Sequence, residues 1–402
     1  MPRMDTSYDV WARSSEPTFE LRGFLDLMSQ LEGFLREPSS ILIDLSTPHH
    51  FGASAMVPLI ALVDSLSSKG WQIDVAPPDD PLLLTYWEST GWLQAIEGIP
   101  LPDIRSRKTY TPIIHFADHH VLNHAVSAAI DILSMTTEYP SGVLNAVEWT
   151  LNEIADNVLV HSTSSGWLQV ISRPKQHAID MVISDTGVGI PGSMRQGYPQ
   201  VQFDSELIEL AVQRGTTRDA SIGQGNGLAG SLRLSEALEG YGNIISGSAA
   251  FRQTPDGNTN VQAIVSYPGT TVNFSLQTQH SIDLSEALWG YSPAKTFEFS
   301  HLAQTGILFL LSAEYSAFGN RASGADLALK LRNIMNDNPN ETVIIDFSGV
   351  DLTSASFLDE FLAKVIRREG IVTFFNRVQL INTNDFVKRT LDEVVAQRIQ
   401  TG

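Results

Sequence analysis

Polar side chains suited to phosphate chemistry recur at intervals of four in one expected helix. The apolar spacing of residues 141–160 predicts this helix. Glu153, Asn157 and His161 fall on the same face of it. An amide oxygen such as that of Asn157, with phosphate oxygens and water, suits Mg²⁺, and a carboxylate one turn earlier can orient an attacking water or hydroxyl. A solvated helical face has the same spacing, so this pattern leaves both interpretations open.

A further carboxylate follows an expected strand. Asp185 comes directly after the apolar run 178–184, and Gly187 and Gly189 follow it. A carboxylate at a strand end can accept a hydrogen bond from an exocyclic amine, while the two glycines let the backbone close against a flat ring. The same pattern also describes a tight turn, so it does not decide between the two by itself.

Three alternating glycines precede the next expected helix. Gly223, Gly225 and Gly227 let consecutive backbone N–H groups converge, and the helix expected over 228–238 adds the positive end of its dipole. Such a loop is suited to a polyphosphate. It is not a dinucleotide fingerprint, because the surrounding order of strands and helices is wrong for a Rossmann unit and the Lys-Ser/Thr pair of a P-loop is absent.

The segments that must position these residues form an α+β pattern. Along the chain we expect helices over 121–135 and 141–160, strands over 167–172 and 178–184, a long loop, a helix over 228–238, and strands over 249–252, 262–266 and 270–276. Grouped helices and strands of this kind predict a layered α+β sandwich.

The parts before and after this region share a β-α-β pattern. The expected strand, helix and strand cover 40–45, 55–66 and 71–75 in the first part, and 342–347, 357–366 and 371–375 in the last. In both, a Ser follows the Asp of the first strand at the same offset, and a Gly ends the helix. These pairs are Asp44 with Ser54, Asp346 with Ser356, and Gly70 with Gly370. Short βαβ units resemble one another for physical reasons alone, so periodicity leaves an internal repeat open.

Length and charge restrict the class of protein. The 402 residues predict two or three domains, and turn-rich breaks suggest three, over 1–110, 111–280 and 281–402, the last with a linker. The net charge of −19 disfavours nucleic acid and anionic lipid as partners. The absence of Cys excludes disulfides and Cys-ligated zinc. Because no apolar run is long enough to span a bilayer, we expect a cytoplasmic protein without membrane contact.

Four segments together resemble the ATP-binding boxes of the GHKL superfamily of gyrase, Hsp90, histidine kinases and MutL. In order and at compatible distances, they are Glu153-x-x-x-Asn157, residues 185–191, residues 223–227, and the Gly-Thr-Thr-Val of 269–272. The resemblance covers residues 113–276, and the pattern Glu-x-x-x-Asn-x-x-x-His is most similar to the anti-sigma-factor serine-kinase branch. It implies a Bergerat-type α/β sandwich with ATP and Mg²⁺ as cofactors.

The resemblance also implies roles for four polar residues. Glu153 would be the general base, and Asn157 would bind Mg²⁺. Asp185 would accept from the adenine amine, with Thr270 contacting adenine or a water beside it.

The glycines and the following loop receive roles in the same way. Gly187 and Gly189 would contact the purine edge, and Gly223, Gly225 and Gly227 the phosphates. Residues 192–222 would form the ATP lid. Its segment 214–218, which ends in Arg218, would reach the γ-phosphate, although an exposed charge pair is an equal alternative.

The flanking parts resemble STAS domains, the anti-anti-sigma fold. The last one resembles the STAS-like module of the DUF4325 type through residues 345–350 and 354–360. Phosphorylatable STAS domains carry Asp-Ser-Ser-Gly after the strand, and the first Ser takes the phosphate. Alignment of the strands places Ala53 and Ala355 at this position. A shift of one residue would restore a serine, so phosphorylation of Ser54, Ser354 or Ser356 is disfavoured but left open.

A metal site is an alternative interpretation of four histidines, His115, His119, His120 and His124. The last two lie one helical turn apart. No carboxylate pattern beyond Asp118 accompanies them, so a solvated helix entry is favoured over a metal site.

The expected fold class is α/β and α+β multidomain, with two small STAS-like βαβ domains flanking the Bergerat-type sandwich. The leading hypothesis is an ATP-hydrolysing regulatory switch that signals to a protein partner of STAS type or sigma-regulatory type. A serine/threonine kinase acting on a STAS partner and a non-catalytic scaffold stabilised by nucleotide are the alternatives. A homo-oligomer is left open.

Overall fold

The structure is a computed structural model that describes residues 8–34, 37–103, 109–162, 164–216, 227–291, 302–303, 306–315 and 318–400. Packing divides the chain into two units. The first consists of Met1–Ala129 and Trp149–Gln277, and the second of Ile130–Glu148 and Thr278–Gly402. The mixed α/β class is confirmed, whereas the three domain boundaries stay predictions. Every helix among the described residues is too short or too polar to span a bilayer.

An antiparallel five-stranded sheet forms the centre of the first unit. Its order is β6 (Ile114–Phe116), β7 (Gly166–Arg173), β8 (Ala178–Asp185), β10 (Thr259–Gln277) and β9 (Tyr241–Gln253). The strands expected over 262–266 and 270–276 are one strand, β10, with register shifts on both sides of Tyr267. Because side chains alternate along a strand, Asp185 and Ser184 point to opposite faces of this sheet.

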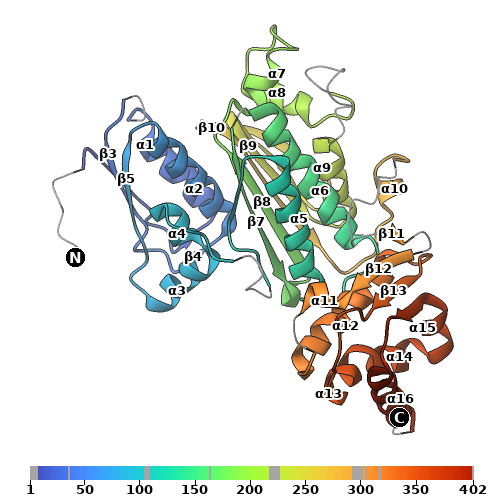
Figure 1. The fold of residues 1–402 in the computed structure, drawn as a ribbon. Helices are drawn as coiled ribbons and strands as arrows, with labels where there is room; N and C mark the ends of the chain where they lie inside the picture. Colours follow the sequence, from blue (N-terminus) through green and yellow to red (C-terminus); the bar gives the residue numbers. More distant parts are fainter. Residues whose placement is uncertain are drawn as a thin grey trace. The chain divides into compact units, whose positions relative to one another are not determined.

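Three helices lie along one face of the sheet (Figure 1). They are α5 (His119–Ser134), α6 (Val143–Asn157) and α9 (Gly227–Ala237), of which α9 contacts β9 and β10. The helices expected over these segments are confirmed to within a few residues. The end of α6 differs from the expectation, because Val158–Ser162 form a π-helical turn, a feature frequent at functional sites.

The N-terminal part of the first unit is a second, parallel sheet with its own helices. Its strands lie in the order β1 (Val10–Arg13), β3 (Ser40–Asp44) and β5 (Gln72–Ala76), and its helices are α1 (Leu21–Leu31), α2 (Ala53–Ser68), α3 (Pro81–Thr90) and α4 (Trp92–Glu97). The short strands β2 (Thr18–Phe19) and β4 (His50–Phe51) pair in parallel.

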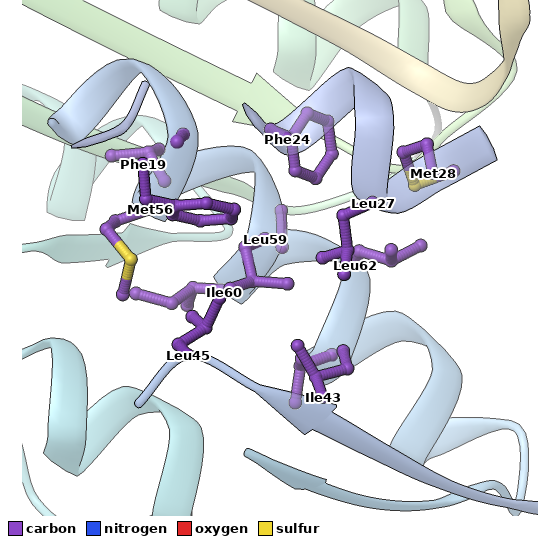
Figure 2. Packing of buried hydrophobic residues seen from close by; sticks show 14 of the residues in the cluster. Phe19, Phe24, Leu27, Met28, Ile43, Leu45, Met56, Leu59, Ile60 and Leu62 are labelled. Carbon is purple, nitrogen blue, oxygen red and sulfur yellow. The ribbon is translucent and has the colours of Figure 1, made fainter. Parts of the chain in front are cut away.

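One hydrophobic core joins this N-terminal part to the large sheet. Helix α2 contacts β5 and also β7 and β8, which explains why it is apolar on nearly all sides. Phe24 and Leu62, which lie among the packed side chains in Figure 2, share a core with Trp167 and Tyr267 of the large sheet. These sheet residues lie on the face opposite Asp185.

The second unit contains a smaller sheet. Its order is β11 (Leu302–Ala303), β12 (Gly306–Leu310), β13 (Val343–Asp346) and β14 (Val378–Ile381), and the last three are parallel. Its helices are α10 (Leu284–Ala287), α11 (Leu311–Glu314), α12 (Arg321–Asp337), α13 (Ala355–Leu358), α14 (Lys364–Glu369), α15 (Ile371–Arg377) and α16 (Asp385–Gln400). A π-helical turn, Asp359–Ala363, joins α13 to α14.

The two small sheets have the same connectivity. In each, a strand and a helix lead to the central strand, β3 or β13, and a further helical segment leads to a third parallel strand. Both central strands end in an Asp whose Oδ1 accepts from the backbone N–H of the Ser two residues later, at 3.0 Å for Asp44 and 2.8 Å for Asp346. The following helices both begin at the Ala aligned above, Ala53 and Ala355.

The strand expected over 371–375 is wrong. These residues belong to α15, and the third strand is β14, which follows it. Gly370, at φ +85°, ends α14, and its carbonyl accepts from the N–H of Phe374, which starts a new helical turn. Phe374 is buried while Ile371 and Val372 are exposed, so burial of one ring in the core overrides the β-branched composition.

Candidate functional site

Asp185 is a buried carboxylate at the end of β8. It lies between Gly166 of β7 and Thr270 of β10 and is only 2% exposed. Its Oδ1 accepts from the backbone N–H of Gly187 at 2.8 Å. Burial raises the pKa of Asp185 to about 7, although the backbone N–H groups of Gly187 and Thr270 favour the ionised form. The side chain is thus an acceptor that lacks the stabilisation an ordinary surface carboxylate receives from water.

The glycines that follow Asp185 are required by close packing. A Cβ at Gly187 would collide with the carbonyl oxygen of Ser162. Gly189 has φ +69°, and a Cβ there would lie 2.8 Å from the carbonyl oxygen of Gly269. The sequence predicts that these glycines let the backbone approach a flat ring. In the structure they also let three chain segments meet beside Asp185.

Ser246 of β9 holds two of these segments together, and its type and spacing carried no signal in the sequence. Its hydroxyl donates to the carbonyl of Gly269 at 2.7 Å and accepts from the N–H of Ile190 at 2.8 Å. It also lies 2.9 Å from the hydroxyl of Thr270. Thr270 pairs directly with Asp185 in the sheet, so the two side chains face the same side. The structure thus brings Asp185, Gly189 and Thr270 together through a residue outside the four boxes.

Glu153 of α6 lies against the start of α9. A Cβ at Gly227, the first residue of α9, would collide with the Glu153 carboxylate, so this glycine leaves the room that the carboxylate occupies. Burial, together with the negative charge of Asp156, raises the pKa of the half-buried Glu153. A carboxylate with a raised pKa beside a helix N-terminus is suited to accept a proton near bound phosphate.

Asn157 is the last residue of α6 and is half-buried. The π-helical turn that follows it connects α6 to the glycine segment, because the carbonyl of Ser162 accepts from the N–H of Val188 at 3.1 Å. His161 lies in this turn. The segment that ends α6 is therefore fixed next to the residues that follow Asp185.

The segment expected as a lid loop over 192–222 contains packed helices. Helix α7 (Gly189–Met194) ends in this segment and helix α8 (Asp204–Ala211) lies within it, and Leu207 and Ile208 are fully buried. Asp204 pairs with Arg195 and accepts from the N–H of Ser248 at 2.7 Å. The loop expected over 204–211 is wrong, because tertiary burial of an apolar pair stabilises the helix. Residues 217–222 of this segment lie outside the described residues. Gly223, Gly225 and Arg218 lie outside the described residues.

The four histidines considered for a metal site, His115, His119, His120 and His124, lie in or beside β6 and α5. His115 packs against Trp167 with ring centroids 4.8 Å apart, and His119 lies 3.3 Å from a carboxylate oxygen of Asp156. Among the described residues, no group of three or more His, Asp or Glu side chains is placed to hold a metal ion.

Two models of known families match parts of the chain. Residues 142–280 match the model of the histidine kinase-, DNA gyrase B- and HSP90-like ATPase, and residues 325–388 match that of the STAS-like domain of unknown function, DUF4325. No curated protein and no solved structure gives a significant match to the chain. The chain therefore contains an ATPase domain of the GHKL type over residues 142–280 and a STAS-like domain over residues 325–388.

Proposed function

We propose that the protein is an ATP-hydrolysing regulatory switch whose ATPase domain signals its nucleotide state to a protein partner through STAS-like domains. One observation carries this proposal: the carboxylate of Glu153 fills the space beside the first residue of α9, within the matched ATPase domain. A scaffold that only binds nucleotide has no need of a proton acceptor at this position.

The residues present fit an adenine nucleotide. Asp185 can accept a hydrogen bond from the adenine amine. Its described hydrogen bonds come from backbone N–H groups, and burial raises its pKa. A further donor such as the amine would therefore stabilise the ionised carboxylate. The N-terminus of α9 would face the phosphates, with Gly223, Gly225 and Gly227 as the expected loop. Asn157 would hold Mg²⁺, which neutralises phosphate charge when bound.

Glu153 would act on the attacking water or hydroxyl. Its raised pKa makes it a better base than an exposed glutamate, and its place beside Gly227 brings it to the phosphate end of the site. Thr270, held by Ser246, would contact adenine or a water beside Asp185. Arg218 is proposed to reach the γ-phosphate.

The proposed output runs through the flanking domains over residues 1–110 and 281–402. We interpret the N-terminal part as STAS-like, because its connectivity and its Asp-x-Ser turn match those of the C-terminal sheet. Within the second unit, Asn333 of α12 binds the connection between α5 and α6. The partner is proposed to be a STAS-type or sigma-regulatory protein.

The fate of the labelled γ-phosphate of ATP distinguishes the switch from the kinase and from the scaffold. Purified protein is incubated with Mg²⁺ and labelled ATP, alone and with a lysate of its own cells. Release of free phosphate that Glu153→Ala abolishes supports the switch. Label carried on another protein supports the kinase, whose nucleophile would be a hydroxyl activated by the same Glu153. Label that stays in ATP supports the scaffold and rejects both.

A further inference from the structure

Tyr267 lies directly behind Asp185, on the sheet face away from the candidate site. Its side chain is fully buried, and its hydroxyl donates to the backbone carbonyl of Asp185 at 3.2 Å. The hydroxyl of Ser184 lies 2.8 Å from it, and that of Thr271 lies 2.8 Å from Ser184. The buried hydroxyl groups of Thr271, Ser184 and Tyr267 thus form a chain that ends at the backbone carbonyl of Asp185.

An irregularity in β10 aims Tyr267 at this carbonyl. The register between β9 and β10 shifts on both sides of Tyr267, and Gly269, two residues later, has φ +95°. The irregular stretch thus carries the residue whose hydroxyl reaches the Asp185 carbonyl. Bulges are frequent next to active sites, where they redirect a side chain.

The N-terminal part of the first unit supports the other side of the tyrosine ring. Phe24 of α1 packs edge-on against Tyr267, with ring centroids 5.7 Å apart and an interplanar angle of 76°. Both rings are fully buried in the core that joins α1 and α2 to the large sheet. A shift of α1 would therefore move the ring whose hydroxyl holds the Asp185 peptide.

We propose that Tyr267 is a positioning residue for adenine recognition by Asp185, and that Phe24 makes base recognition depend on the N-terminal domain. The peptide between Asp185 and Thr186 leads to Gly187, whose N–H returns to the Asp185 carboxylate. Holding its carbonyl from behind fixes the direction in which the carboxylate points. This inference rests on the proposed function, because it assumes that Asp185 binds adenine.

The test measures selectivity for the base in the full chain. ATP and inosine triphosphate, which carries a carbonyl in place of the adenine amine, are titrated calorimetrically into wild type and Tyr267→Phe. We expect Tyr267→Phe to lower ATP affinity about 10-fold and to leave inosine triphosphate within about 2-fold, so that selectivity falls. A merely structural role would reduce the active fraction for both nucleotides and leave the ratio of affinities unchanged, and that result would overturn the proposal.

Matched variants separate the contact from general loss of packing. Tyr241→Phe removes a tyrosine hydroxyl at the first residue of β9, which pairs with Ser275 of β10, eight residues after Tyr267, and should keep the wild-type ratio. Phe24→Leu should lower the ratio, whereas Phe19→Leu, a residue that packs against Phe51 instead, should not. If Phe24→Leu and Phe19→Leu have the same ratio of ATP affinity to inosine triphosphate affinity, the N-terminal domain has no role in base recognition. If wild type fails to bind ATP, or Asp185→Ala binds it as tightly, the proposed function itself fails.

Discussion

At the scale of single residues, the raised pKa of Asp185 makes stability depend on pH. Its pKa is about 7 in the folded chain against 3.8 for the unperturbed group, so the folded state holds its proton more tightly. The stability from this group is fully present below pH 3.8, and it is lost as pH rises to about 7. Asp185→Asn removes this dependence. We expect variant and wild type to be equally stable near pH 4, and the variant to be more stable above pH 7, by up to about 4 kcal/mol.

Denaturant unfolding of both proteins at several pH values checks this expectation. The useful quantity is the difference between them, because other titrating groups contribute to both. A difference that stays constant from pH 4 to pH 8 would show that burial does not perturb this carboxylate.

Glu153 and Asn157 should lose different properties. Glu153→Ala should keep ATP affinity within a few fold while slowing phosphoryl transfer by about 10² to 10⁴, the usual contribution of a general base. Asn157→Ala should instead lose the part of the affinity that depends on Mg²⁺. Titrations with and without Mg²⁺, followed by single-turnover rates, separate the two. Equal loss of binding in both variants contradicts this division of roles.

At the scale of elements, a buried amide of α12 binds three backbone groups of the connection between α5 and α6. Asn333 donates to the carbonyls of Ser134 and Thr137, both at 2.8 Å, and accepts from the N–H of Tyr139 at 2.7 Å. Asn333→Ala should leave three backbone groups without this partner. We expect the free energy of unfolding to fall by about 2–4 kcal/mol.

Asn336 on the same helix is the matched control. It is only half-buried, and its amide contacts the carbonyl of Tyr139 at 3.2 Å. Asn336→Ala should therefore cost less than about 1 kcal/mol. Chemical denaturation of both variants checks the pair. A similar cost for the two would mean that burial of the Asn333 amide does not govern this contact.

At the scale of the whole molecule, we expect the flanking domains to respond to ATP without being phosphorylated. Ser54 donates to Glu20 at 2.7 Å, and Ser354 is the N-cap of α13, where it accepts from the N–H of Phe357 at 3.0 Å. A phosphate on Ser54 would face a carboxylate, and the chain already carries a net charge of −19. Ala355 occupies the aligned acceptor position on the C-terminal side and has no hydroxyl.

Intact-mass measurement after long incubation with Mg²⁺ and ATP checks this expectation. The mass should stay unmodified, while limited proteolysis should show protection of both flanks that depends on nucleotide. A stoichiometric gain of one phosphate on Ser54, Ser354 or Ser356 would contradict the switch and favour the kinase.

The sequence predicts candidate residues for phosphate chemistry and most of the elements that carry them. Side-chain type and local spacing mark Glu153, Asp185 and Gly227 as candidates, because local periodicity is set by the geometry of helix and strand. Only the resemblance of four segments together gives these residues roles. The order of elements then restricted the fold to a layered sandwich between two βαβ parts. These inferences use only interactions between residues close in the chain.

The contacts that support these residues follow only from packing between segments that are distant in the chain. Tyr267 contacts Asp185, which is 82 residues away in the sequence. No local sequence pattern predicts that its hydroxyl donates to the carbonyl of a residue so far away in the chain. Helix α8 in the lid segment and helix α15 in place of a strand depend on burial of Leu207, Ile208 and Phe374 in cores built by other segments. Because such burial outweighs the small differences in local propensity, the partners of each side chain, and hence the support of the site, follow from packing between distant segments.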